Sequence, residues 1–88
     1  MPSITVGLPA ALTSPEPPSV VTCDAATVFE ALRGVAARSP RYEQRLFYRD
    51  RLLVVVSLNG RHLPPATAGG TALAAGDRID VLPPVAGG

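Results

Sequence analysis

The chain ends in the stretch RIDVLPPVAGG, residues 78–88, and this stretch decides which fold we expect. Ile79 and Val81 stand at alternate positions, which is typical of a strand with one buried face. Pro83 and Pro84 follow at once and end the strand, because proline has no backbone N–H to donate to a neighbouring strand. The sequence therefore predicts a final strand that stops at Leu82.

The two terminal glycines contribute nothing to a folded core. Glycine has no side chain to pack, and it loses more backbone freedom on ordering than any other residue. Gly87 and Gly88 suit a terminus that passes through a narrow channel and presents its carboxylate to another protein. We therefore predict a folded domain over residues 1–82, a flexible tail over 83–88, and the Gly88 carboxylate as the reactive group.

Length and composition limit the classes of protein to consider. With 88 residues the chain has material for one domain, and a hydrophobic content of 47% favours a packed core over disorder. A net charge of +1 disfavours a nucleic-acid partner. No apolar run approaches the roughly 20 residues of a membrane span, no signal peptide is recognisable, and the single cysteine, Cys23, cannot form an internal disulfide. We expect a soluble cytoplasmic protein without a membrane partner.

Short apolar or β-branched runs separated by turn residues predict the strands. The turn signals are a proline-rich loop at 13–18, the dipeptide Asn59-Gly60, which strongly favours a hairpin, and Gly76-Asp77. The expected strands are residues 3–8, 19–23, 52–58, 61–63 and 78–82.

One amphipathic helix is predicted from Val28 to roughly Arg38. Thr27 and Glu30 form a capping box at its start, and Pro40 stops it. Its apolar stripe comprises Val28, Ala31, Leu32, Val35 and Ala36. The segment 41–51, rich in arginine and aromatic residues, is compatible with either a short second helix or an ordered loop.

This order of elements predicts an α+β fold of the β-grasp, or ubiquitin-like, type. We expect a mixed sheet of about five strands packed on one main helix, with the last strand parallel to the first in the sheet interior. The expected core consists of Ile4, Val6, Leu32, Val35, Val54, Val56, Ile79 and Val81.

The C-terminal third resembles the MoaD/ThiS family of sulfur carriers. The similarity rests on Asn59-Gly60 after an apolar strand and on the pattern LxxGDxIxVLPPVAGG at residues 73–88. The length and the long first loop are most similar to the molybdopterin-type and cysteine-biosynthesis carriers.

The resemblance implies a protein co-substrate rather than an enzyme, with no bound cofactor. An enzyme of the ubiquitin-activating type would use ATP to adenylate the Gly88 carboxylate. The same type of enzyme would take part in the transfer of sulfur to the activated terminus. Conversion to a thiocarboxylate would follow, and a downstream acceptor enzyme would take the sulfur. A free carboxylate is ionised at pH 7 and is a poor electrophile, so the activation step is necessary.

Partner binding is expected at the tail and beside it. Val85 to Gly88 should be the most mobile segment of the free protein. An exposed apolar patch near the tail, with Arg78 beside it, would dock the activating enzyme. The expected partner-binding residues are Leu82, Pro83, Pro84, Val85, Ala86, Leu63, Phe47 and Arg78.

Other conspicuous residues are expected to have structural roles. Cys23 should be a buried strand residue, His62 an exposed edge residue, and Gly69-Gly70 a flexible loop. No metal-ligand spacing is recognisable. A solvated face should account for Arg33, Arg38, Arg41, Arg45, Arg49 and Arg51.

Two other functions fit the same sequence. A ubiquitin-like modifier would be conjugated through Gly88 to lysines of other proteins, and a β-grasp interaction module would leave the terminus inert. Loading with ATP and a sulfur source separates the carrier from the inert module, whereas amine-linked adducts indicate the modifier.

Overall fold

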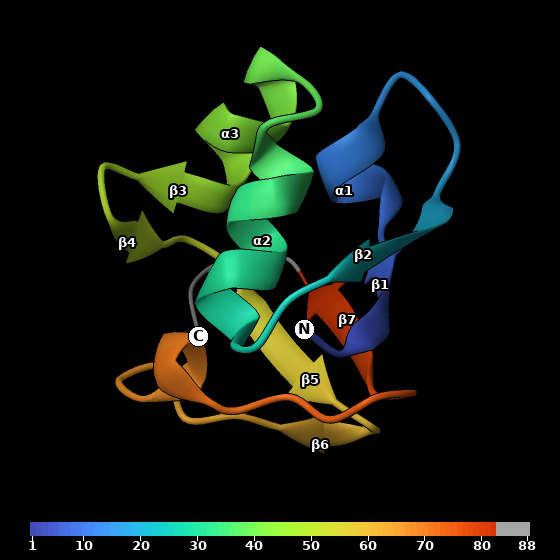
Figure 1. The fold of residues 1–88 in the computed structure, drawn as a ribbon. Helices are drawn as coiled ribbons and strands as arrows, with labels where there is room; N and C mark the ends of the chain where they lie inside the picture. The colour runs from blue at the N-terminus through green and yellow to red at the C-terminus, as the bar shows by residue number, and fades with distance from the viewer. Residues whose placement is uncertain (83–88) are drawn as a thin grey trace.

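Strand β7, Arg78–Leu82, lies in the middle of a five-stranded sheet in the computed structural model, which describes residues 1–82 (Figure 1). The strand order is β2-β1-β7-β5-β6, and β7 is parallel to β1 and antiparallel to β5. The other strands are β1 (Ser3–Leu8), β2 (Ser19–Asp24), β5 (Val55–Leu58) and β6 (Arg61–His62). The predicted mixed β-grasp sheet, with the last strand beside the first, is confirmed.

Alternation along the central strands gives the sheet an apolar inner face. Ile79 and Val81 of β7 are at most 2% exposed, and they pack in one cluster with the inward residues of β1 and β5. The other face, which we call the outer face, carries the alternate residues, among them Arg78 and Asp80 of β7. The inward residues of the neighbouring strands are Ile4, Val6, Leu8 and Val56.

Helix α2, Val28–Ala36, covers the inner face of the sheet (Figure 1). Thr27 caps it as predicted, since its side-chain oxygen accepts a hydrogen bond from the Glu30 N–H at 3.2 Å. The whole predicted apolar stripe is buried, with Leu32 and Val35 at 0% exposure.

The segment left unassigned by the sequence contains both a helix and a hairpin. Helix α3, Pro40–Leu46, begins directly after α2, because the Ser39 side chain caps it and Pro40 occupies its first turn, where no N–H is needed. Strands β3 (Phe47–Tyr48) and β4 (Arg51–Leu52) then form a separate two-stranded sheet.

Two local predictions, for residues 52–58 and for Gly69-Gly70, are wrong, and one short helix was not predicted. Residues 52–58 do not form one strand: β4 pairs with β3, β5 joins the main sheet, and Val54 at the bend between them is only half-buried. A short helix α1, Ala10–Thr13, precedes the proline-rich loop. Gly69 and Gly70 belong to the 3₁₀ helix η1, Ala68–Gly70, where Gly69 packs against Phe29, rather than to a flexible loop.

Arg33 is a structural residue, which corrects the expectation that the arginines form a solvated face. Its guanidinium lies 4.1 Å from the centre of the Phe47 ring. Nη2 donates to the Arg49 carbonyl oxygen at 2.8 Å and to Asp50 Oδ1 at 3.0 Å. These contacts attach the β3–β4 hairpin to α2.

We predict that Leu32→Ala lowers the free energy of unfolding by about 2–5 kcal/mol, because it leaves a cavity between α2 and the sheet. The matched control is Leu53→Ala, at a leucine that is 42% exposed, which should cost less than about 1 kcal/mol. Chemical denaturation of the three proteins measures both values. Equal losses for the two variants would contradict the assigned core.

Candidate functional site

The end of β7 determines where the chain terminus can act. Gly88 lies six residues beyond Leu82, the last described residue. An extended chain spans at most about 3.6 Å per residue, so the Gly88 carboxylate stays within roughly 20 Å of Leu82. The surface around the end of β7 is therefore a candidate for contact with a protein that acts on this carboxylate.

That surface contains a shallow groove of about 330 Å³ on the outer face, which we call the outer groove. Strand β7 forms part of its lining, and the ends of β1 and β2 complete it. Its main lining residues are Gly7, Pro9, Pro18, Val20, Asp80 and Leu82. Val20 is 56% exposed, so the groove offers a partner an apolar side chain.

Gly7 allows a charged pair to lie flat across the sheet beside the groove. Gly7 is the register neighbour of Asp80, and a Cβ on Gly7 would collide with Asp80 Oδ1 and lie 2.9 Å from Arg78 Nη2. In the space that Gly7 leaves, Arg78 Nη2 and Nε donate to Asp80 Oδ1 at 3.0 and 3.1 Å. The hydrogen bond to Asp80 and the charge of Asp80 raise the pKa of Arg78. The pair therefore presents balanced charge next to Leu82.

The structure brings together only part of the predicted docking patch. Arg78 and Leu82 share the outer face, with Arg78 exposed and Leu82 half-buried. Phe47 was expected to be exposed and is not: it is 5% exposed and meets the Phe29 ring edge-on at a centroid distance of 5.6 Å. Leu63 packs against the core, and its N–H donates to the carbonyl oxygen of the inward-facing Val56. Phe47 was misplaced because its burial depends on contacts with another element, whereas Leu63 is half-buried and its docking role stays a prediction.

The predicted tail residues lie outside the described part of the chain. This holds for Pro83, Pro84, Val85 and Ala86, for Gly87 and Gly88, and for the expected mobility of the segment from Val85 onward.

Sequence reasoning missed Gly7 and Val20. The run SVVTC at residues 19–23 contains two adjacent valines, and the pattern does not show which one faces inward. The register pairs Val21 with the buried Val6 and Val20 with Gly7, so Val20 lies on the outer face.

A polar network at the start of β7 fixes its position against β5. Asn59 Nδ2 donates to Asp77 Oδ1 at 3.0 Å, and Asn59 Oδ1 accepts from the Arg78 N–H at 2.9 Å. Asp77 Oδ2 accepts from the Ala74 N–H at 2.8 Å. Asn59 and Gly60 both have positive φ, as the predicted Asn-Gly hairpin requires. The hairpin turn and the Gly76-Asp77 turn thus hold each other in place.

The remaining candidate side chains have structural surroundings. Cys23 is half-buried on β2 rather than fully buried, and burial raises the pKa of its thiol, which disfavours the thiolate nucleophile. His62 is exposed on the edge strand β6, as predicted. Within residues 1–82, no three His, Cys, Asp or Glu side chains are grouped to hold a metal ion. No described helix is long and apolar enough to cross a bilayer.

A second hollow, of about 620 Å³, lies among the N-terminal turn of α2, strand β4 and η1. It shares no lining residue with the outer groove, and its charged lining residues within 1–82 are Asp50 and Arg51. Its lining residues within 1–82 include none from β7.

Comparison with family models places most of the chain in one family. The model of the ThiS family matches residues 12–88, a match that includes α2, β7 and the terminal Gly-Gly. A search of curated protein sequences gave no match.

Solved structures of similar proteins share the fold along nearly the whole chain. Small archaeal modifier protein 1 of Haloferax volcanii is 28% identical, with 97% of this chain and 100% of that chain covered and a TM-score of 0.75. A chain of the Amycolatopsis orientalis BexX/CysO complex is also 28% identical, with coverage of 97% and 99% and a TM-score of 0.72. A putative molybdopterin converting factor subunit 1 from Pyrococcus furiosus, at 18% identity, coverage of 97% and 100% and a TM-score of 0.65, shares the fold.

We predict that the Asp77 network makes stability depend on pH in acid. The Ala74 N–H, and after it the Asn59 side chain, lowers the pKa of Asp77 below its ordinary value. The stabilisation is therefore complete above the ordinary aspartate pKa of about 4 and is lost as the pH falls through the lower folded value. Asp77→Asn should be less stable than the parent at pH 7, and thermal melts in a pH series should show the difference closing below about pH 4. A difference that stays constant into acid would contradict this assignment.

Proposed function

The chain belongs to the ThiS family, and we propose that it is a sulfur carrier protein whose reactive group is the Gly88 carboxylate. A partner enzyme adenylates this carboxylate, the acyl-adenylate is converted to a thiocarboxylate, and the thiocarboxylate donates sulfur in a biosynthetic reaction. The observation that carries the proposal is that the family match runs through the terminal Gly87-Gly88.

The chemistry requires nothing of the side chains of the folded body. A Gly88 carboxylate oxygen attacks the α-phosphorus of ATP, and pyrophosphate leaves. A hydrosulfide-equivalent nucleophile then adds to the activated carbonyl carbon, AMP leaves, and one oxygen of the terminus has been replaced by sulfur. Glycine at positions 87 and 88 leaves the carbonyl open to attack, since no Cβ stands beside the path of the nucleophile.

The folded body is the part of the chain that the partner enzyme binds. The carboxylate is tethered to Leu82, and Leu82 lines the outer groove, so the groove is the docking surface that we propose for the partner. Val20 and Leu82 supply apolar contact there, and the Arg78–Asp80 pair supplies donors and acceptors without net charge. Similarity to a chain of the two-protein BexX/CysO complex supports a carrier that works by docking.

A second function, that of a ubiquitin-like modifier, is favoured by the similarity to small archaeal modifier protein 1. It uses the same activated Gly88 carbonyl, with a lysine amine of another protein as the nucleophile in place of sulfur. This chain contains no lysine, so lysine-linked chains of the protein on itself are excluded. Mass spectrometry of cell lysate for Gly-Gly-linked lysine adducts separates the two functions.

We predict that deletion of Gly88 abolishes adenylation and sulfur loading while the melting temperature is unchanged. The deletion leaves a terminal carboxylate on Gly87, one residue short of the reacting position, and the folded residues 1–82 remain. Incubation with a ubiquitin-activating-type enzyme, ATP and sulfide, followed by mass spectrometry of the C-terminal peptide, measures loading. Cys23→Ser is the control and should load normally. Sulfur found on Cys23, or loading of the chain without Gly88, would overturn the proposal.

We also predict that Val20→Asp weakens docking of the adenylating enzyme. The substitution places a charge in the apolar part of the outer groove, and a loss of about tenfold in affinity is expected for a desolvated interface position. The matched control is Tyr48→Asp, at another exposed apolar residue, on β3 outside the groove. Titration calorimetry gives both affinities. If the two variants bind equally well, the docking surface lies elsewhere.

A further inference from the structure

The connection between β1 and β2, residues 9–18, begins and ends at the outer groove. Pro9 and Pro18 both line the groove, and between them the chain forms α1 and the proline-rich loop. Because β1 and β7 are parallel and Gly7 is level with Asp80, the connection leaves β1 where β7 nears its end. The connection therefore lies at the point from which the tail departs.

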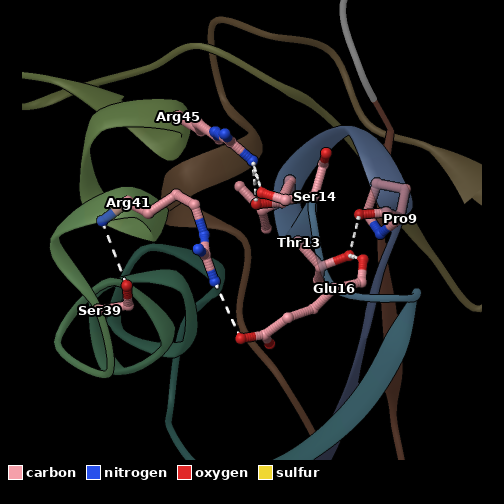
Figure 2. Close-up of polar contacts among 8 residues, drawn as sticks. Pro9, Thr13, Ser14, Glu16, Ser39, Arg41 and Arg45 are labelled. Carbon is pink, nitrogen blue, oxygen red and sulfur yellow. Dashed lines mark hydrogen bonds and ion pairs between the residues drawn. The ribbon is translucent and has the colours of Figure 1, made fainter.

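Helix α3 contacts the middle of this connection through hydrogen bonds (Figure 2). Arg45 Nη1 donates to the carbonyl oxygens of Leu12 and Ser14, both at 2.9 Å. These carbonyls lie at the C-terminal end of α1, where a helix leaves acceptors unpaired and where a cation is favourable. One guanidinium thus satisfies two acceptors on a segment 31 and 33 residues away in the sequence.

A second arginine of α3 holds the loop that follows. Arg41 Nη2 lies 3.3 Å from Glu16 Oε1, and Figure 2 shows this contact beside that of Arg45. Inside the loop, the buried Thr13 side chain donates to the Glu16 carbonyl oxygen at 3.0 Å. The loop is therefore fixed both internally and against α3.

These contacts keep the connection on the inner side of the sheet. Leu12 is 2% exposed and belongs to the core cluster, and Figure 1 shows α1 beside α3 rather than over the outer face. A connection released from α3 would have the outer groove within reach, because both of its ends lie there.

We propose that Arg45, assisted by Arg41, is a positioning residue for delivery of the tail. It holds the connection 9–18 against α3, so that the connection does not cover the outer groove and the lining of the groove is ordered before a partner binds. The proposal rests on the sulfur-carrier function above and adds to it a residue whose hydrogen bonds within residues 1–82 are made to the connection. Without Arg45 the partner must order the connection when it docks, which reduces affinity without altering the chemistry at Gly88.

The test is the ATP–pyrophosphate exchange that a ubiquitin-activating-type adenylating enzyme performs with this chain as its substrate. Arg45→Met removes the donors and keeps most of the side-chain volume. We expect the KM for the carrier to rise about tenfold, as for the loss of two charge-assisted hydrogen bonds, with kcat within about twofold of the parent. The matched control is Arg51→Met, which removes the same charge from β4 and should leave both constants unchanged.

A second measurement reports on the connection itself. The Ser14 and Glu16 amides donate to the Ala10 and Thr13 carbonyl oxygens, so their hydrogen exchange reports whether the connection stays seated. In Arg45→Met their exchange should accelerate at least about tenfold, while amides within α2 keep their protection. If Arg45→Met does not fold, Glu16→Gln decides, because it removes only the negative charge that faces Arg41 and should raise KM in the same direction by a smaller factor.

The outcomes separate this proposal from the one on which it rests. If the parent chain supports no ATP–pyrophosphate exchange, the sulfur-carrier function fails. If the parent is active and Arg45→Met has the KM of Arg51→Met, or loses kcat at constant KM, the positioning role is overturned. Unchanged exchange at Ser14 and Glu16 in Arg45→Met overturns it as well.

Discussion

The parallel pairing of β7 with β1 is the constraint on which the rest of the structure depends. Parallel neighbours cannot be joined by a tight turn, so everything between them in the chain becomes one long crossover. Insertion of β7 between β1 and β5 buries Ile79 and Val81 beneath α2. It also brings the last described residue, Leu82, to the same end of the sheet as the β1–β2 connection. A tail that begins there leaves from a strand that is paired on both sides.

The same register gives the two faces of the sheet different tasks. On the inner face, apolar residues of β1 and β7 hold the fold together, whereas on the outer face Gly7 stands level with Asp80 and leaves room for its pair with Arg78. A larger residue at position 7 would collide with that pair, which lines the outer groove. Residues that stabilise the fold and residues available for docking thus alternate along the same strands. This arrangement suits a protein whose folded body binds a partner while only its terminus reacts.

The sequence correctly predicted the elements whose formation depends on residues that are neighbours in the chain. The strand at 3–8, the capped helix from Val28, the Asn59-Gly60 turn and the last strand all agree with the structure. The predictions failed where tertiary contacts decide. Residues 52–58 are apolar almost throughout, so nothing in the pattern shows that β4 and β5 belong to different sheets. The burial of Phe47 depends on Phe29 and Arg33, which approach it from another element.

The arginines explain how a small domain keeps its long connections ordered. Arg33 holds the β3–β4 hairpin, Arg45 holds the β1–β2 connection, and Arg38 Nη2 donates to the Thr22 carbonyl oxygen on the edge strand β2 at 3.2 Å. Arg33 and Arg38 each donate through Nη2, and Arg45 donates through Nη1, so that one terminal nitrogen of each guanidinium reaches a backbone carbonyl. Exposed ion pairs alone contribute little to stability, whereas hydrogen bonds that satisfy carbonyls at helix and strand ends also fix position. These arginine side chains therefore bond to groups of the domain itself. The surface around the end of β7 remains apolar and charge-balanced for a partner.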